Sequence, residues 1–88
     1  MATSWSRMIK RAVGGDWKAI KQKYGLYTYS GNLNGVTVHI DQQHYIPSLE
    51  PGYITTIWRV TRGAETIGAG LCPVDAALSA KYHLELSA

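Results

Sequence analysis

The sequence contains no phenylalanine and only one cysteine. Its aromatic residues are three tryptophans and six tyrosines, so every ring carries a polar N–H or O–H group that suits half-buried positions and contact surfaces. The single cysteine, Cys72, has no partner for an internal disulfide, which fits a reducing cytoplasm. The sequence contains no run of 18 apolar residues, which a membrane-spanning helix would need. Residues 1–6 lack the apolar core of a signal peptide. These absences predict a cytoplasmic protein.

Charged residues are also few, at 17% of the sequence, whereas apolar residues make up 45%. Intrinsic disorder requires the opposite balance. With 88 residues, the chain has room for one domain and a small core. We therefore expect residues 1–88 to form a single globular domain.

The charges that are present are distributed unevenly. Residues 1–25 contain six cations against one acid, Asp16, whereas residues 26–88 contain three cations against five acids. Such an asymmetry is typical of a face that binds an anionic partner, and it also occurs on a solvated helix that keeps a domain soluble.

The strongest pattern lies between Trp5 and Tyr24, where apolar residues recur at helical spacing and form one face. The opposite face carries Arg7, Lys10, Arg11, Lys18 and Lys21, which fall within roughly 100° of one another at ~100° per residue. Gly14 and Gly15 weaken the helix, and Asp16 could cap a new one. The segment is therefore one kinked helix over residues 5–24 or two short helices.

After Gly25 the period of the apolar residues changes to two. The sequence predicts four strands, within residues 26–29, 36–41, 53–62 and 66–71. Asn34-Gly35 indicates a hairpin, and the prolines within residues 42–52 indicate a connecting loop. Pro73 and Asp75 suit the first turn of a helix over residues 73–83, and the tail over 82–86 is compatible with helix or strand.

This order predicts an α+β domain in which a four-stranded, mostly antiparallel sheet is flanked by two helices on one sheet face. The other face would be open. Alternation along the strands gives three sets of residues that could line it together: Tyr27 and Tyr29; Thr37, His39 and Asp41; and Tyr53, Thr55, Ile57, Arg59 and Thr61.

No catalytic or metal-binding motif is apparent. His39, His44 and His83 are scattered and do not form a set of ligands with Cys72. Cys72 precedes a helix, where a thiolate would be favoured, but a cysteine there is more often a small buried or capping residue. We expect no enzyme activity, no cofactor and no bound metal.

Residues 66–70 followed by residues 75–81 form a glycine-containing strand and an alanine-rich helix, and in this the segment 53–83 resembles double-stranded-RNA-binding domains. The resemblance implies a helix–sheet–helix fold that binds duplex RNA. Members of that family carry a basic cluster at the start of the last helix to hold phosphates. The corresponding residues here, 71–75, include no base and one acid, Asp75.

In size and character, the chain also resembles the small anti-CRISPR proteins of phages and other mobile elements, which are compact, non-catalytic and bind a host complex. That resemblance implies a stoichiometric inhibitor of a protein or nucleoprotein assembly. The alternatives are a nucleic-acid-binding domain and a basic helix that lies on an anionic membrane; the second would remove apolar residues that a small core needs. The candidate partner-binding residues are Arg7, Lys10, Arg11, Lys18, Lys21, Tyr27, Tyr29 and Arg59.

Overall fold

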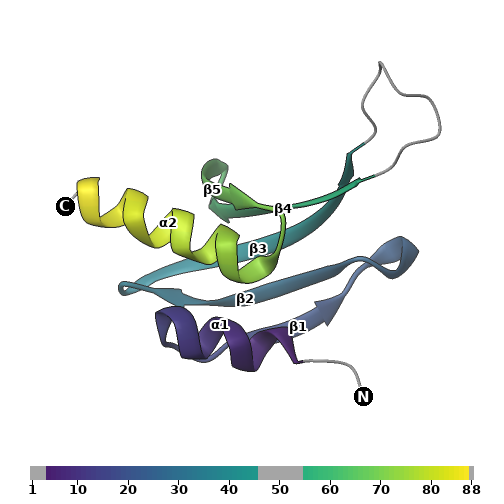
Figure 1. Ribbon diagram of the computed structural model, residues 1–88, viewed down its shortest axis with the longest axis horizontal. Coiled ribbons are helices and arrows are strands. Elements are labelled where there is room, and N and C mark those ends of the chain that lie inside the picture. The colour runs from purple at the N-terminus through teal and green to yellow at the C-terminus, as the bar shows by residue number, and fades with distance from the viewer. Residues whose placement is uncertain (1–3, 46–54, 88) are drawn as a thin grey trace.

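Five antiparallel strands, paired in the order in which they occur along the chain, form one sheet with a helix before it and a helix after it (Figure 1). The computed structural model describes residues 4–45 and 55–87. Its elements are α1 (Trp5–Val13), β1 (Lys18–Lys21), the 3-10 turn η1 (Lys23–Gly25), β2 (Tyr27–Leu33), β3 (Val36–Tyr45), β4 (Thr55–Arg62), β5 (Glu65–Gly70) and α2 (Pro73–Ser87). The predicted α+β class is confirmed, whereas the predicted count of four strands is wrong.

The additional strand arises where the sequence predicted helix. α1 ends at Val13 because Gly14 and Gly15 have φ angles of 78° and 82°, which a continuing helix does not allow. Residues Lys18–Lys21 then pair with Tyr27–Ser30 as β1. All four residues of β1 are exposed, so their sequence carries no alternation that would indicate a strand. The predicted helix over 5–24, whether kinked or divided, is therefore wrong beyond Val13.

Trp17 joins α1 to the sheet. Its indole is buried, and its Nε1 donates a hydrogen bond of 2.8 Å to the Gly14 carbonyl. The ring lies directly on Gly31 of β2, where a Cβ atom would meet ring carbons of Trp17 at 2.7 Å. Only a glycine leaves room for this contact.

The remaining strands follow the sequence more closely. Asn34 and Gly35, both with positive φ, form the predicted two-residue turn between β2 and β3. β3 continues to Tyr45, so residues 42–45 belong to a strand and not to the predicted loop. The rest of that loop, together with Tyr53, lies outside the described residues.

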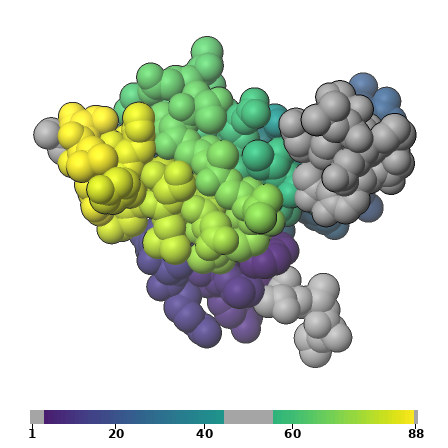
Figure 2. All heavy atoms as spheres, turned by 45° about the horizontal axis from the view of Figure 1, so that its top comes forward, coloured from purple at the N-terminus to yellow at the C-terminus, as the bar shows by residue number. Residues whose placement is uncertain are grey.

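The buried core joins both helices to the sheet. Ile9 of α1 and four residues of α2 pack against Tyr29, Leu33, Val38, Ile40, Trp58, Val60 and Ile67 of the sheet. Apart from the buried Thr28, the described residues of β2, β3 and β4 that alternate with these are more exposed. The two helices also contact each other (Figure 2).

α2 begins at Pro73, as expected, and the residue before it caps the helix. The backbone N–H of Asp75 donates to Cys72 Sγ at 3.4 Å, and that of Ala76 donates to the Cys72 carbonyl at 3.0 Å. Residues 82–86 are helical, which resolves the alternative left open by the sequence. The alanine face of α2 lies so close to β5 that a Cβ atom on Gly68 would be 2.6 Å from Ala80 N. No helix in the described part of the chain is long and apolar enough to cross a membrane.

We predict that Gly31→Ala destabilises the domain by about 1–3 kcal/mol, because the added methyl displaces the Trp17 ring. This change should lower the melting temperature by about 4 °C or more in a domain of this size, with a red shift of tryptophan emission as Trp17 becomes solvated. Ser30→Thr, which adds one carbon at the preceding residue of β2, is the control. Unchanged melting of Gly31→Ala would contradict the observed Trp17 packing.

Candidate functional site

The basic residues predicted to share one helix face lie on two different elements. Arg7, Lys10 and Arg11 are exposed on α1, whose N-terminus is capped by Ser4 Oγ accepting from Arg7 N at 3.4 Å. Lys10 Nζ lies 3.2 Å from an Asp16 carboxylate oxygen in an exposed ion pair. Exposed pairs of this kind contribute little to stability, so Lys10 is available to an anionic partner.

Lys18 and Lys21 lie on β1 and not on a helix. They are three residues apart on a strand, so they point to opposite faces of the sheet. β1 is one of the two edge strands of the sheet, and α1 leads into it through residues 14–17 (Figure 1). The prediction of one helical stripe is therefore wrong: the six cations of residues 1–25 are divided among α1, β1 and η1. We refer to Arg7, Lys10, Arg11, Lys18, Lys21 and Lys23 as the basic edge.

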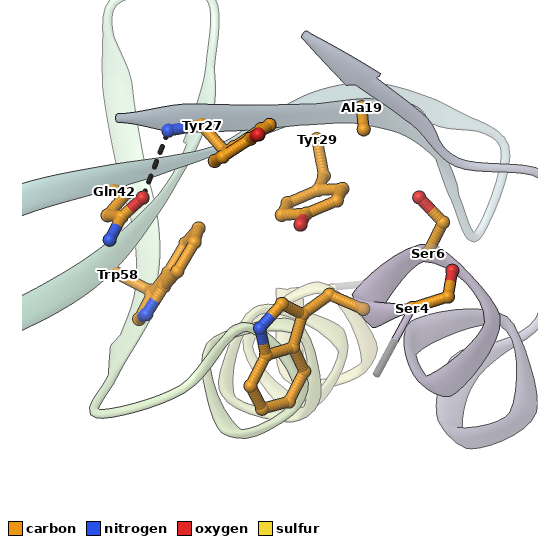
Figure 3. Close-up of a pocket in the computed structure, with 8 residues that line it drawn as sticks. Ser4, Ser6, Ala19, Tyr27, Tyr29, Gln42 and Trp58 are labelled. Atoms are coloured by element: carbon orange, nitrogen blue, oxygen red, sulfur yellow. Dashed lines mark hydrogen bonds between the residues drawn. The ribbon is translucent and has the colours of Figure 1, made fainter. Parts of the chain in front are cut away.

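A pocket of about 470 Å³ opens between the first turn of α1 and the ends of β1, β2, β3 and β4 (Figure 3). It is lined by Ser4, Trp5, Ser6, Ala19, Tyr27, Tyr29, Gln42 and Trp58. Four of these eight residues are aromatic and none is charged. We refer to this site as the aromatic pocket.

Tyr29 occupies the centre of the aromatic residues. Its ring centroid lies 6.5 Å from that of Tyr27, with nearly parallel planes, and 5.8 Å from that of Trp58 in a tilted arrangement. Tyr29 as a whole is almost completely buried, but its hydroxyl, which has no hydrogen-bond partner within residues 4–45 and 55–87, remains accessible to solvent. Burial, with a smaller effect from Tyr27, raises the pKa of Tyr29 above its usual value of 10.0. The hydroxyl is therefore protonated at neutral pH and can donate a hydrogen bond.

The prediction that Tyr27 and Tyr29 share the open sheet face with Arg59 is wrong. Tyr29 pairs with Ile40, which is buried, whereas Arg59 pairs with Asp41 on the opposite face. The strand register does bring His39 opposite Thr61 on that open face, as expected. Asp41 there accepts a hydrogen bond of 2.7 Å from Thr28 Oγ1. Arg59 is thus an exposed cation on a polar surface, on the opposite side of the sheet from Tyr27 and Tyr29.

Sequence reasoning missed the aromatic pocket as a site. It noted Tyr27 and Tyr29 but not Trp5, Trp58 or Gln42. Trp58 and Arg59 are adjacent on β4, so their side chains point to opposite faces of the sheet. Because Arg59 is on the open face, the period of two marks Trp58 as a core residue. Only the register of β3 with β4, which places Gln42 opposite Trp58, and the position of α1 show that these residues meet.

No group of three or more His, Cys, Asp or Glu side chains that could hold a metal ion is present among residues 4–45 and 55–87. No family model, curated protein or solved structure matches this chain.

We predict that Tyr29 makes the stability of the domain sensitive to alkaline pH. Above pH 10.0 the unfolded chain loses the Tyr29 proton while the folded protein retains it, so the free energy of unfolding falls as pH rises through the folded-state pKa. Tyr29→Phe lacks this loss. Between about pH 9 and about pH 11, chemical denaturation should show a smaller decline for Tyr29→Phe than for the parent protein. Parallel declines would contradict the raised pKa of Tyr29.

Proposed function

We propose that this protein is a non-catalytic binding module that inhibits a protein or nucleoprotein assembly stoichiometrically, as anti-CRISPR proteins do. The observation that carries the proposal is the basic edge: six exposed cations on three successive elements, with Asp16 the single acid among residues 4–25. A concentration of one sign of charge on one side of a small domain increases the rate of encounter with an anionic surface.

The distribution of these cations favours a protein surface over a nucleic-acid duplex as the partner. Lys18 and Lys21 point to opposite faces of the edge strand, and Arg59 lies on the open face, so the cations do not follow one line that would match a phosphate backbone. The start of α2, where duplex-RNA-binding domains hold phosphates, has Asp75 exposed and no base. Duplex binding remains the second candidate because the six cations could still hold a backbone without sequence preference.

We predict no binding of fluorescein-labelled duplex DNA or duplex RNA at ~100 mM salt, measured by fluorescence anisotropy, because a protein surface is the partner. A duplex held by the basic edge would instead show log affinity that falls by several units per unit of log salt, as neutralised phosphates release counterions. Binding with that dependence would replace the protein-partner proposal with the nucleic-acid one.

We predict that purified protein inhibits target cleavage by at least one of a panel of purified CRISPR effector complexes at about one molar equivalent. Reversal of Lys10, Arg11, Lys18 and Lys21 to Glu should weaken that inhibition on the order of 100-fold by removing attraction at the interface and adding repulsion. Because these side chains are exposed, each change should alter stability by less than about 0.5 kcal/mol, which circular dichroism melting would verify.

The control variant carries Arg62→Gln and Lys81→Gln, which neutralise two cations on β4 and α2 outside the basic edge. These residues form exposed ion pairs with Glu65 and Glu85, so little stability depends on them. The control should inhibit as the parent does. Full inhibition by the folded quadruple variant would exclude the basic edge, and failure to inhibit any complex would exclude the anti-CRISPR assignment.

A further inference from the structure

The aromatic pocket has the dimensions and lining of a ligand site. Small-molecule sites typically enclose about 300–1,000 Å³ and have mostly apolar walls with a few convergent polar groups. At about 470 Å³, this pocket lies within that range, and its walls combine four aromatic rings with the hydroxyls of Ser4 and Ser6 and the amide of Gln42. None of the basic-edge residues lines it, so it is a separate site from the surface proposed above.

The rings favour a planar guest. Tyr27 and Tyr29 are stacked at 6.5 Å between centroids, and Trp58 is tilted against Tyr29 at 5.8 Å. Figure 3 shows these rings of β2 and β4 on one side of the pocket and Ser4 and Ser6 of α1 on the other. Aromatic walls of this kind stack against heteroaromatic bases, at about 1–3 kcal/mol per base.

Polar groups without a partner lie among these rings. The Tyr29 side chain is 6% exposed, and its ring extends from β2 toward the space bounded by Trp58 and α1 (Figure 3). Its hydroxyl has no hydrogen-bond partner in the described part of the chain. Gln42 Oε1 accepts from Tyr27 N at 3.0 Å, which orients the amide and leaves its Nε2 without a partner among the described residues. The Tyr29 hydroxyl, which stays accessible from the pocket, and the oriented Gln42 amide suit the donors and acceptors on the edge of a base.

The opposite wall of the pocket favours an anion. Ser4, Trp5 and Ser6, which form the cap and start of α1, all line it. Backbone N–H groups at the start of a helix have no intrahelical partner and lie at the positive end of the helix dipole. No acidic side chain occupies the first turn of α1. An uncharged aromatic compartment therefore adjoins a positively polarised one.

We propose that the aromatic pocket binds a nucleotide, with the base stacked against the wall formed by the rings of Tyr27, Tyr29 and Trp58 and the phosphate at the start of α1. The shared chemistry is a heteroaromatic base that carries a phosphate, supplied either as a free mononucleotide or as one nucleotide of a single strand. A duplex does not supply it, because its bases are stacked and paired. This inference goes beyond the proposed function and does not depend on it.

The protein reports such binding through its own fluorescence. Trp5 and Trp58 line the pocket, whereas Trp17 is packed on Gly31 and does not line it. Titration with adenosine 5′-monophosphate should quench the emission saturably. Adenosine should bind about tenfold more weakly, because it lacks the phosphate that the helix start would hold. Ribose 5-phosphate, which has no base, should compete with the mononucleotide at least tenfold more weakly than adenosine 5′-monophosphate itself.

Three variants test the residues. Tyr29→Phe keeps the ring and removes the hydroxyl, and should weaken mononucleotide binding about fivefold. Tyr27→Ala removes a partly exposed ring from the wall and should weaken it about tenfold or more. Tyr82→Ala, which removes an exposed tyrosine from α2 outside the pocket, is the matched control and should bind as the parent does. Melting curves verify that all three variants fold.

A single-stranded oligonucleotide of about ten nucleotides distinguishes the two sources of the ligand. Tighter binding of the oligonucleotide than of the mononucleotide supports a strand as the source, and equal affinity supports a free nucleotide. Absence of saturable quenching at millimolar mononucleotide would overturn the proposal, as would equal loss of binding in Tyr82→Ala and Tyr27→Ala. Equal affinity for adenosine would overturn the phosphate site at α1. Each of these results leaves the effector-inhibition test unaffected, because that test alters only the basic edge.

Discussion

The contact between the Trp17 indole and the backbone of Gly31 determines the arrangement of the N-terminal half. Gly14 and Gly15 end α1 and turn the chain, and Trp17 then inserts against β2, with its Nε1 bonded to the Gly14 carbonyl. This anchoring places Lys18–Lys21 beside β2 as β1, the strand that the sequence did not predict. It also fixes where α1 lies relative to the sheet. Both candidate sites follow from it: the basic edge spans α1 and β1, and the aromatic pocket is bounded by the start of α1 and by Ala19 of β1.

The sequence predicts the fold most successfully where local chemistry and tertiary packing agree. The alternation in Val36–Ile40, the Asn34-Gly35 turn and Pro73 at a helix start each lead to the element observed. The prediction fails between Gly14 and Tyr24 because a helical period and a short exposed strand are both compatible with Lys18-Ala19-Ile20-Lys21. The competing factor is tertiary: burial of Trp17 on Gly31 is worth more than continuing a helix through two glycines, and no local pattern reveals that contact.

The candidate site residues differ in the same way: some positions follow from the local sequence pattern, and others depend on tertiary packing. Exposure of Arg7, Lys10 and Arg11 follows from the amphipathic pattern alone, and the structure agrees with it. The sheet face on which Tyr29 lies does not follow from the sequence pattern. Alternation defines two sets of residues on each strand without showing which set is buried. The side chains of the partner strands decide it: Tyr29 is opposite Ile40, and Ile40 is opposite Val60, all of them buried. The sequence therefore predicts the wrong sheet face for Tyr27 and Tyr29, although it correctly predicts that the two share a face.

The absence of phenylalanine acquires a physical meaning in this arrangement. A core built around phenylalanine at position 29 would bury the same ring area without a polar atom. Tyr29 instead carries its hydroxyl to the place where the sheet extends beyond the cover of the two helices, beside Trp58 and the start of α1. The hydroxyl adds nothing to the apolar contacts that hold the sheet to the helices. Its position is advantageous when the pocket holds a group that accepts a hydrogen bond from it. The use of tyrosine in place of phenylalanine therefore suits the ligand proposed for the aromatic pocket.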